Sequence, residues 1–355
     1  MRDCMIENSI PFGSTSSSIL TELKTCVFST IEKNSVSKGK FNSESKNKLN
    51  TKVKMEDNWS IDESDDGSIL GDYHQENAKP PTILLYSSVF MKFNTMFKIA
   101  DDSKLLIEGC FMENFKENWV MLANPKLIKL INSKITYSEM SGVTISWSDS
   151  VEETQKWKAI EIEGWEITNN NINGIEIYWD SFVAQNLSVE IKNSKISENK
   201  ENGLFIARIA LTELVIHECK IINNGSKGLV LRSVHSKNNM PKFTIYNSKI
   251  NKNKEIGILL EDSGAEIGYS EWWNNFRHGI WIIGTNKPAQ ISNEVINFLI
   301  KRPMNINIES MKINENKWCG VTSTNFWKGK ISIAHSSISM NWEDGVMLSN
   351  TFTEM

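Results

Sequence analysis

The residue types that most often carry out catalysis are scattered along this chain of 355 residues. Nucleophilic catalysis needs a serine or cysteine beside a base, usually a histidine that an acidic residue orients. The five histidines follow no such spacing, and we expect them to be solvated or packed side chains: His74, His217, His235, His278 and His335. The sequence therefore indicates no catalytic triad.

The five cysteines are equally scattered and never form a Cys-x-x-Cys pair: Cys4, Cys26, Cys110, Cys219 and Cys319. We expect free, buried thiols and, with them, a reducing compartment. Acidic residues offer one alternative chemistry, because Asp149, Glu176 and Asp180 could gather near one loop and bind a cation. No denser cluster of metal-binding residue types occurs, so we predict no metal site and no cofactor.

The strongest spacing signal in the chain is a repeated phrase. An apolar residue is followed by Asn three places later and by Gly seven places later. Seven copies keep this spacing: Ile167-Asn170-Gly174, Ile196-Asn199-Gly203, Ile221-Asn224-Gly228, Ile250-Asn253-Gly257, Trp272-Asn275-Gly279, Ile313-Asn316-Gly320 and Ile338-Asn341-Gly345. Two weaker copies precede them: Phe111-Asn114-Asn118 and Ile135-Ser138-Gly142. The steps between copies vary from 22 to 41 residues, so a constant unit repeats with variable loops.

Alternating apolar residues flank the phrase on both sides, as Ile160 and Ile162 do before Ile167 and Ile175 and Ile177 do after it. A period of two marks strands with one buried face. Asn suits a bend because it tolerates the left-handed backbone region, and Gly allows a positive φ or close packing. The pattern predicts an all-β fold, a right-handed parallel β-helix of about nine coils.

Phrases such as NSKITYSEMSGVTI, NSKISENKENGLFI and NSKINKNKEIGILL resemble the parallel β-helix repeats of the pectin-lyase-like superfamily. Among intracellular proteins they are similar to the repeats of the F-box β-helix adaptors and of the SHC SH2-domain-binding protein family. The resemblance covers roughly residues 100 to 350. It implies a binding scaffold in the cytosolic relatives and saccharide cleavage in the secreted ones, and the fold alone does not choose between them.

The β-helix register predicts which side chains point outward from the strand after each Gly. Vertical neighbours in adjacent coils lie about 4.8 Å apart and touch. Hydrolysis of a saccharide needs two carboxylates within roughly 5 to 10 Å, but Glu176 has Thr144 and Phe205 as neighbours. Glu261 falls beside Arg232, where we expect an ion pair. The outward columns contain no pair of acids, and we predict that the chain is not an enzyme.

One outward column is apolar over four successive coils: Phe205, Val230, Leu259 and Trp281. A contiguous exposed apolar stripe marks an interaction surface. Three interpretations stay open. The stripe receives a protein partner with Phe205 and Trp281 as anchors, or it binds a saccharide by stacking, helped by Tyr178 and Arg232, or another segment of the chain covers it.

Residues 1–80 differ in composition from the rest, because Ser, Asn and Lys dominate and apolar residues are few. We predict a mostly disordered tail there, with one amphipathic helix at 18–33 where apolar residues recur at helical spacing. The β-helix then spans 81–355. Helical spacing of Ile291, Val295 and Phe298 predicts a helical insertion at 289–303, which Pro303 ends.

The net charge of −4 is small, which argues against binding of nucleic acid. The first residues do not read as a signal peptide, and no apolar run approaches the ~18 residues of a membrane span, so we expect a cytoplasmic protein. The favoured function is a non-enzymatic intracellular scaffold that binds a protein partner on its exposed strand face. The alternative is a carbohydrate-binding or carbohydrate-active protein. End-to-end self-association through open solenoid ends is a further possibility.

Overall fold

A computed structural model of the chain describes sixteen ranges, namely 5–7, 20–24, 27–29, 70–71, 82–86, 89–91, 97–99, 104–116, 120–123, 125–147, 158–179, 187–236, 243–284, 305–326, 329–349 and 351. Every regular element in these ranges is a β-strand. They therefore contain no helix that is long and apolar enough to cross a membrane.

The strands form three parallel sheets, which we name A, B and C in the order in which the chain visits them in each coil. Sheet A contains β2 (Leu20–Lys24), β5 (Thr82–Tyr86), β8 (Lys104–Glu108), β11 (Leu127–Ile131), β14 (Lys158–Glu163), β17 (Leu187–Lys192), β20 (Glu213–His217), β23 (Phe243–Tyr246), β26 (Ala265–Gly268), β29 (Ile306–Glu309) and β32 (Ile331–Ala334). Sheet B contains β1 (Met5–Glu7), β3 (Val27–Ser29), β6 (Val89–Met91), β9 (Phe111–Phe115), β12 (Lys134–Ser138), β15 (Glu166–Thr168), β18 (Lys195–Ser197), β21 (Lys220–Ile222), β24 (Lys249–Asn251), β27 (Glu271–Trp273), β30 (Lys312–Asn314) and β33 (Ser337–Ser339). Sheet C contains β4 (Leu70–Gly71), β7 (Phe97–Ile99), β10 (Val120–Ala123), β13 (Val143–Trp147), β16 (Ile175–Trp179), β19 (Leu204–Leu211), β22 (Leu229–Ser236), β25 (Ile258–Glu261), β28 (Ile280–Ile283), β31 (Val321–Thr324) and β34 (Val346–Ser349).

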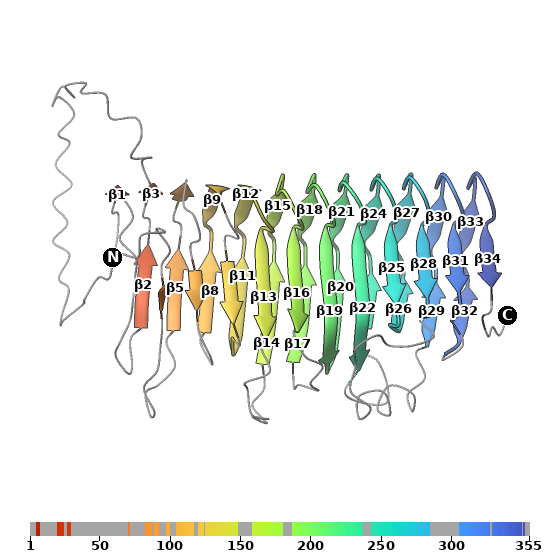
Figure 1. Cartoon of the computed structure of the whole chain (residues 1–355), viewed down its shortest axis with the longest axis horizontal. Coiled ribbons are helices and arrows are strands. Elements are labelled where there is room, and N and C mark those ends of the chain that lie inside the picture. The colour runs from red at the N-terminus through yellow and green to blue at the C-terminus, as the bar shows by residue number, and fades with distance from the viewer. Residues whose placement is uncertain are drawn as a thin grey trace, which may run out of the picture.

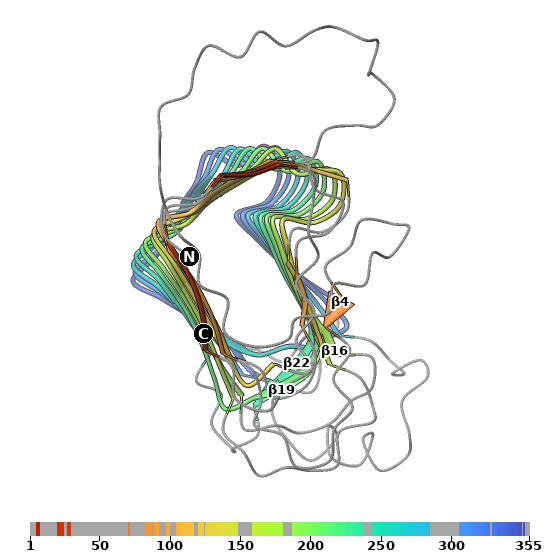
Figure 2. The same ribbon diagram turned by 90° about the vertical axis from the view of Figure 1, so that its left-hand side faces the viewer.

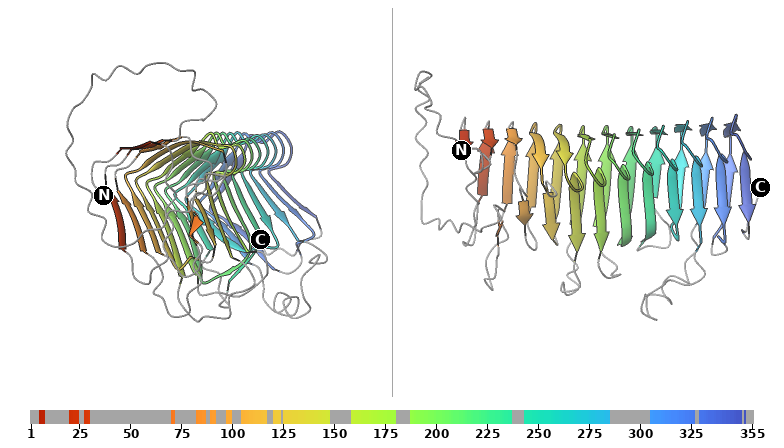
Figure 3. Two further views of the ribbon diagram at one scale, coloured as in Figure 1. Left: turned by 60° about the vertical axis from the view of Figure 1, so that its left-hand side comes forward. Right: turned by 45° about the horizontal axis from the view of Figure 1, so that its top comes forward.

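The coils stack along the long axis of the molecule, from β1 and β2 at one end to β34 at the other (Figure 1). A view along the stack shows the coils superimposed on one three-sided outline (Figure 2). Two further views show the same regular advance from coil to coil (Figure 3). Matching residues of successive coils therefore form straight columns, and these columns decide which side chains meet.

The strand pairings confirm the register that the sequence predicts. In sheet A, Ile160 pairs with Ile128 of the coil before and with Val189 of the coil after. In sheet C, Ile177 pairs with Ile206 of the next coil. These inward residues are buried and belong to one continuous core. Period-two alternation was therefore sufficient to separate inward from outward positions.

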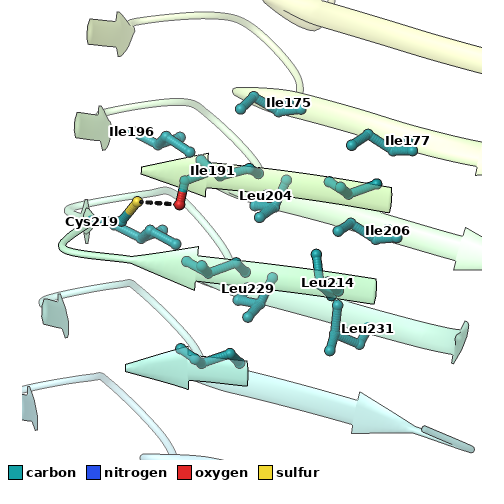
Figure 4. Packing of buried hydrophobic residues seen from close by; sticks show 14 of the residues in the cluster. Ile175, Ile177, Ile191, Ile196, Leu204, Ile206, Leu214, Cys219, Leu229 and Leu231 are labelled. Carbon is teal, nitrogen blue, oxygen red and sulfur yellow. Dashed lines mark hydrogen bonds between the residues drawn. The ribbon is translucent and has the colours of Figure 1, made fainter. Parts of the chain in front are cut away.

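Figure 4 shows part of the core packing, with Cys219 beside Ile191 and Ile196. The Cys219 thiol donates a hydrogen bond to the Ile191 carbonyl oxygen at 3.4 Å. Burial raises the pKa of this thiol to about 11. The three cysteines in the described residues are buried and form no disulfide, as the scattered spacing predicts: Cys110, Cys219 and Cys319.

A polar column runs through the bend that follows sheet B. The side-chain nitrogen of Asn224 donates to the side-chain oxygen of Asn253 at 3.1 Å. The side-chain oxygen of Asn224 accepts from the side-chain nitrogen of Asn199 at 3.0 Å. The same bond joins every pair of successive motif asparagines: Asn170, Asn199, Asn224, Asn253, Asn275, Asn316 and Asn341. The left-handed backbone falls one residue earlier, as at Asn223 with a φ of 59°. The preceding residue makes the bend, and the motif Asn points its amide into the stack.

The motif Gly is required because the chain of the next coil approaches it closely. A Cβ at Gly203 would lie 2.5 Å from Ile221 Cγ2 and 2.8 Å from the Gly228 carbonyl oxygen. The glycines with positive φ in the described residues are Gly109 and Gly164, which lie outside the motif. Of the two roles that the sequence allows, close packing is therefore the one that the fold uses.

The N-terminal residues depart from the sequence predictions. Strands β1 to β4 lie within residues 1–80, and the rest of that range is outside the described residues. The helix predicted at 18–33 is wrong where this range is described, because Leu20–Lys24 and Val27–Ser29 are strands. Pairing of β2 with β5 over five residues overrides the helical spacing.

The repeat found in the sequence accounts for nine strands of sheet B, β9 to β33, and the strands β1, β3 and β6 extend this sheet to twelve. In β9 the predicted register is wrong by one residue, because the buried Met112, and not Phe111, pairs with Ile135. The helical insertion predicted at 289–303 lies outside the described residues.

Candidate binding face on sheet C

The outward column predicted from the sequence exists in sheet C. Phe205 pairs with Val230, Val230 with Leu259, and Leu259 with Trp281. Glu176 precedes Phe205 in the column, and Thr322 follows Trp281 in the next coil. The four apolar residues are therefore vertical neighbours, as expected.

Their exposure differs from the prediction of one continuous stripe. Val230 is 2% exposed and Leu259 is 4% exposed, so both are buried, whereas Phe205 and Trp281 are half-buried. The physical reason is side-chain size, because each aliphatic residue has a large aromatic residue as one vertical neighbour. The column presents two separate aromatic rings, not an apolar stripe.

Charged groups flank the Phe205 ring. Arg232 and Glu261 pair across adjacent coils, with Nε and Oε2 at 2.7 Å, and this confirms the predicted ion pair. The Arg232 guanidinium carbon also lies 5.8 Å from the Phe205 ring centroid, within reach of a cation–π contact. Tyr178 pairs with Ala207 in the neighbouring outward column and is half-buried. The face thus combines aromatic surface with charged and hydroxyl groups.

Glu176 lies at the N-terminal end of the column and accepts a hydrogen bond from Ser141 Oγ at 2.9 Å. Its column neighbours are Thr144 and Phe205, so no second carboxylate adjoins it there. Asp149 and Asp180, the other members of the cation site considered from the sequence, lie outside the described residues. Within the described part of the chain, His, Cys, Asp and Glu side chains form no group of three that could hold a metal ion.

The C-terminal end of the column packs against a histidine that sequence reasoning did not single out. His278 is buried, and its ring centroid lies 5.4 Å from that of Trp281. Its Nδ1 is 2.9 Å from Thr322 Oγ1, in hydrogen-bonding contact. Burial, with a smaller contribution from the charge of Arg277, lowers the pKa of His278 to about 4. The imidazole is therefore neutral near pH 7 and contacts both Trp281 and Thr322.

A positional signal for His278 was present in the sequence. The residue just before the motif Gly faces the outward column of the next coil, as Ser141 faces Glu176 and His278 faces Thr322. This contact crosses a bend, so strand alternation alone does not reveal it.

A family model described as right handed beta helix region matches residues 82–240 and 120–296, which together span more than half of the chain. The chain belongs to the right-handed β-helix family. The predicted right-handed parallel β-helix is thereby confirmed, whereas the resemblance to F-box β-helix adaptors and SHC SH2-domain-binding proteins finds no support.

Solved structures that resemble this β-helix protein include epimerases. A mutant of the periplasmic alginate epimerase AlgG matches with a TM-score of 0.42 and 14% identity, over 78% of this chain and 71% of that one. The A-module of mannuronan C-5 epimerase AlgE6 from Azotobacter vinelandii matches with a TM-score of 0.35 and 11% identity, over 78% of this chain and 84% of that one. No curated protein sequence matches the β-helix protein.

These matches correct the prediction that the chain is not an enzyme. That prediction rested on the lack of paired acids in the outward columns, but the solved structures that match are enzymes. At such low identity and TM-score the likeness is one of fold, so no residue role passes from them to this chain. The cytoplasmic location and the protein partner stay predictions.

Proposed function

We propose that this β-helix protein binds a saccharide chain along the outer face of sheet C, with Phe205 and Trp281 as stacking platforms. The observation that supports the proposal most directly is the pair of half-buried rings separated by buried Val230 and Leu259. Three coil steps separate the rings, a distance of about 14 Å. A few sugar units in an extended chain cover that length, and the apolar face of a sugar ring stacks on an aromatic side chain.

The polar groups beside the rings fit the same ligand. Hydroxyl groups of a sugar need donors and acceptors close to the stacking ring, and the Arg232–Glu261 pair lies beside Phe205. At the other end, the Trp281 indole nitrogen donates to Thr324 Oγ1 at 3.4 Å, which leaves the Thr324 hydroxyl hydrogen available to a ligand. Binding sites in which few polar groups converge on apolar surface favour small organic ligands.

A protein partner is the competing proposal, and it is a weaker fit to the same residues. Protein interfaces concentrate their binding energy in a central apolar cluster. Here the centre of the column is buried, and only its two ends expose apolar surface. A protein partner would meet two isolated rings, one of them with an ion pair beside it.

Binding to an array of defined oligosaccharides, followed by calorimetry on those that bind, tests the proposal. We expect Phe205→Ala and Trp281→Ala each to weaken saccharide binding about tenfold or more, since each removes one stacking ring. Tyr269→Ala is the matched control, because Tyr269 is an aromatic residue 66% exposed at another bend. It should bind as the wild type does.

Two results would contradict the proposal. Wild-type protein that binds no oligosaccharide on the array excludes it directly. Saccharide binding that survives the double variant Phe205→Ala/Trp281→Ala with unchanged affinity places the site elsewhere. The circular dichroism spectra and melting temperatures of the wild type and of the variants establish that each protein is folded.

A further inference from the structure

The bend between sheets B and C carries exposed aromatic side chains in three neighbouring coils. Phe276 is 53% exposed, Trp318 is 42% exposed and Trp342 is 76% exposed. We name these residues, together with Arg277 and Lys317, the aromatic corner. Exposed tryptophan, phenylalanine and arginine in one patch are the residue types that dominate binding hot spots.

Backbone hydrogen bonds align the aromatic corner in two columns. The Lys317 amide donates to the Asn275 carbonyl oxygen at 3.1 Å, and the Trp342 amide donates to the Asn316 carbonyl oxygen at 3.1 Å. The Trp318 amide donates to the Arg277 carbonyl oxygen at 2.9 Å. The backbone under these side chains is thus held in place before any partner arrives, which lowers the entropic cost of binding.

The two cations of the corner lie on aromatic rings. Lys317 Nζ is 4.1 Å from the Phe276 centroid and 5.8 Å from the Trp342 centroid, so it lies near both rings. The Arg277 guanidinium carbon is 5.4 Å from the Trp318 centroid. Cation–π attraction keeps these positive charges at the surface beside apolar groups.

Neither cation has a carboxylate partner in the described residues, unlike the cations of neighbouring columns. Lys227 pairs with Glu255 at 2.8 Å, and Lys249 pairs with Glu271 at 3.1 Å. The pKa of Glu255 is lowered chiefly by its hydrogen bond from Lys227 and least by the charge of Arg277. The Glu255 Oε2 accepts from both Lys227 and Ser226. Glu343 follows Trp318 in the same column, but its Oε2 accepts from the Cys319 thiol at 3.7 Å and forms no ion pair with either cation. Arg277 and Lys317 are therefore two positive charges with which a carboxylate from outside could pair.

We propose that the aromatic corner binds an acidic segment of a partner protein, whose carboxylates pair with Lys317 and Arg277 while its apolar side chains pack on the exposed rings. A saccharide fits this surface less well than an acidic segment, because Arg277 and Lys317 have no carboxylate partner in the described residues, whereas Arg232 beside Phe205 is paired with Glu261. The proposal concerns a surface and a ligand class separate from those of the sheet C face, and it stands or falls independently of saccharide binding.

Fluorescence anisotropy with a labelled synthetic peptide that alternates Glu and Leu tests the proposal. We expect Arg277→Gln/Lys317→Gln to weaken peptide binding about tenfold or more, because both ion pairs are lost. Trp318→Ala should also weaken it, since an apolar contact is removed. Raised salt should weaken binding to the wild type, as ion pairing requires.

Lys254→Gln is the matched control. Lys254 occupies the same column as Lys317, one coil before Phe276, and is exposed. This variant should bind the peptide as the wild type does, and so should Trp281→Ala on the sheet C face. The same peptide with Lys in place of Glu should not bind.

Three results would overturn the proposal. They are wild-type protein that does not bind the acidic peptide, equal binding of the Lys-containing peptide, and unchanged affinity in Arg277→Gln/Lys317→Gln. If Trp318→Ala removed binding of an oligosaccharide and left peptide binding intact, the corner would be part of a saccharide site instead. Each substituted side chain is exposed or half-buried, so we expect all of these variants to fold.

Discussion

At the bend after sheet B, five repeats present polar or small residues four places after the motif apolar residue: Glu139, Asn171, Lys200, Gly225 and Lys254. The last three repeats present Phe276, Lys317 and Trp342 at the same position, so that two aromatic residues stand where those five repeats have none. Beneath both regions the asparagine ladder continues without change. The interior of this fold is constrained by stacking and its exterior is not, so residues that depart from the repeat on the outside are the ones to examine for function.

The largest expected effect is a loss of stability when a motif glycine, part of the interior beneath both regions, is replaced. Gly203→Ala should lower the free energy of unfolding by about 3 kcal/mol, because the added Cβ would overlap atoms of the next coil. Gly345→Ala, at the same motif position in the last repeat, should cost little, since its nearest neighbours would be 3.7 Å away. Urea unfolding of both variants measures the difference. Equal losses would show that close packing is not what selects Gly.

A smaller loss of stability should come from His278, in the C-terminal region, as the pH falls. The pKa of His278 is lowered to about 4 in the folded chain from an ordinary value near 6.5. The unfolded chain therefore binds the extra proton first as the pH falls, and stability present above pH 6.5 is lost toward pH 4. This loss amounts to on the order of 2 to 3 kcal/mol.

His278→Gln tests the titration, because an amide can still bond Thr322 but does not gain a proton. Urea unfolding across this pH range should give a shallower loss of stability for the variant than for the wild type. The same slope in both proteins would contradict the assignment. The corresponding positions in two earlier repeats are Asn173 and Asn202, which bond each other and do not titrate.

The smallest effect on stability should come from the aromatic corner itself. Lys317→Met removes the cation near Phe276 and Trp342 and should change the free energy of unfolding by about 0.5 kcal/mol, because the site is exposed. Lys254→Met, in the polar region of the same column, should change it even less. Paired thermal melts compare the two. A large loss in Lys317→Met would mean that the corner serves the fold and not a partner.

Much of the architecture follows from sequence spacing. The step of seven from apolar residue to Gly predicted the bend, and alternation around it predicted strands whose pairings the structure confirms, such as Ile160 with Val189. The same reasoning failed at residues 18–33, because helical spacing over a few residues is a weaker determinant than pairing with an existing sheet. It counted His278 among solvated or packed side chains but did not identify its partner Thr322, which is 44 residues away and is reached across a bend.

By itself, the sequence determined the coil, its register and the vertical order of each column, because stacking repeats every coil on the last and a period of two fixes which side faces inward. It did not determine which outward residues reach solvent. Val230 and Leu259 are outward yet buried, and Phe276, Trp318 and Trp342 are exposed at a bend. Exposure depends on the size and direction of neighbours that are distant in the sequence, so only the tertiary structure decides it.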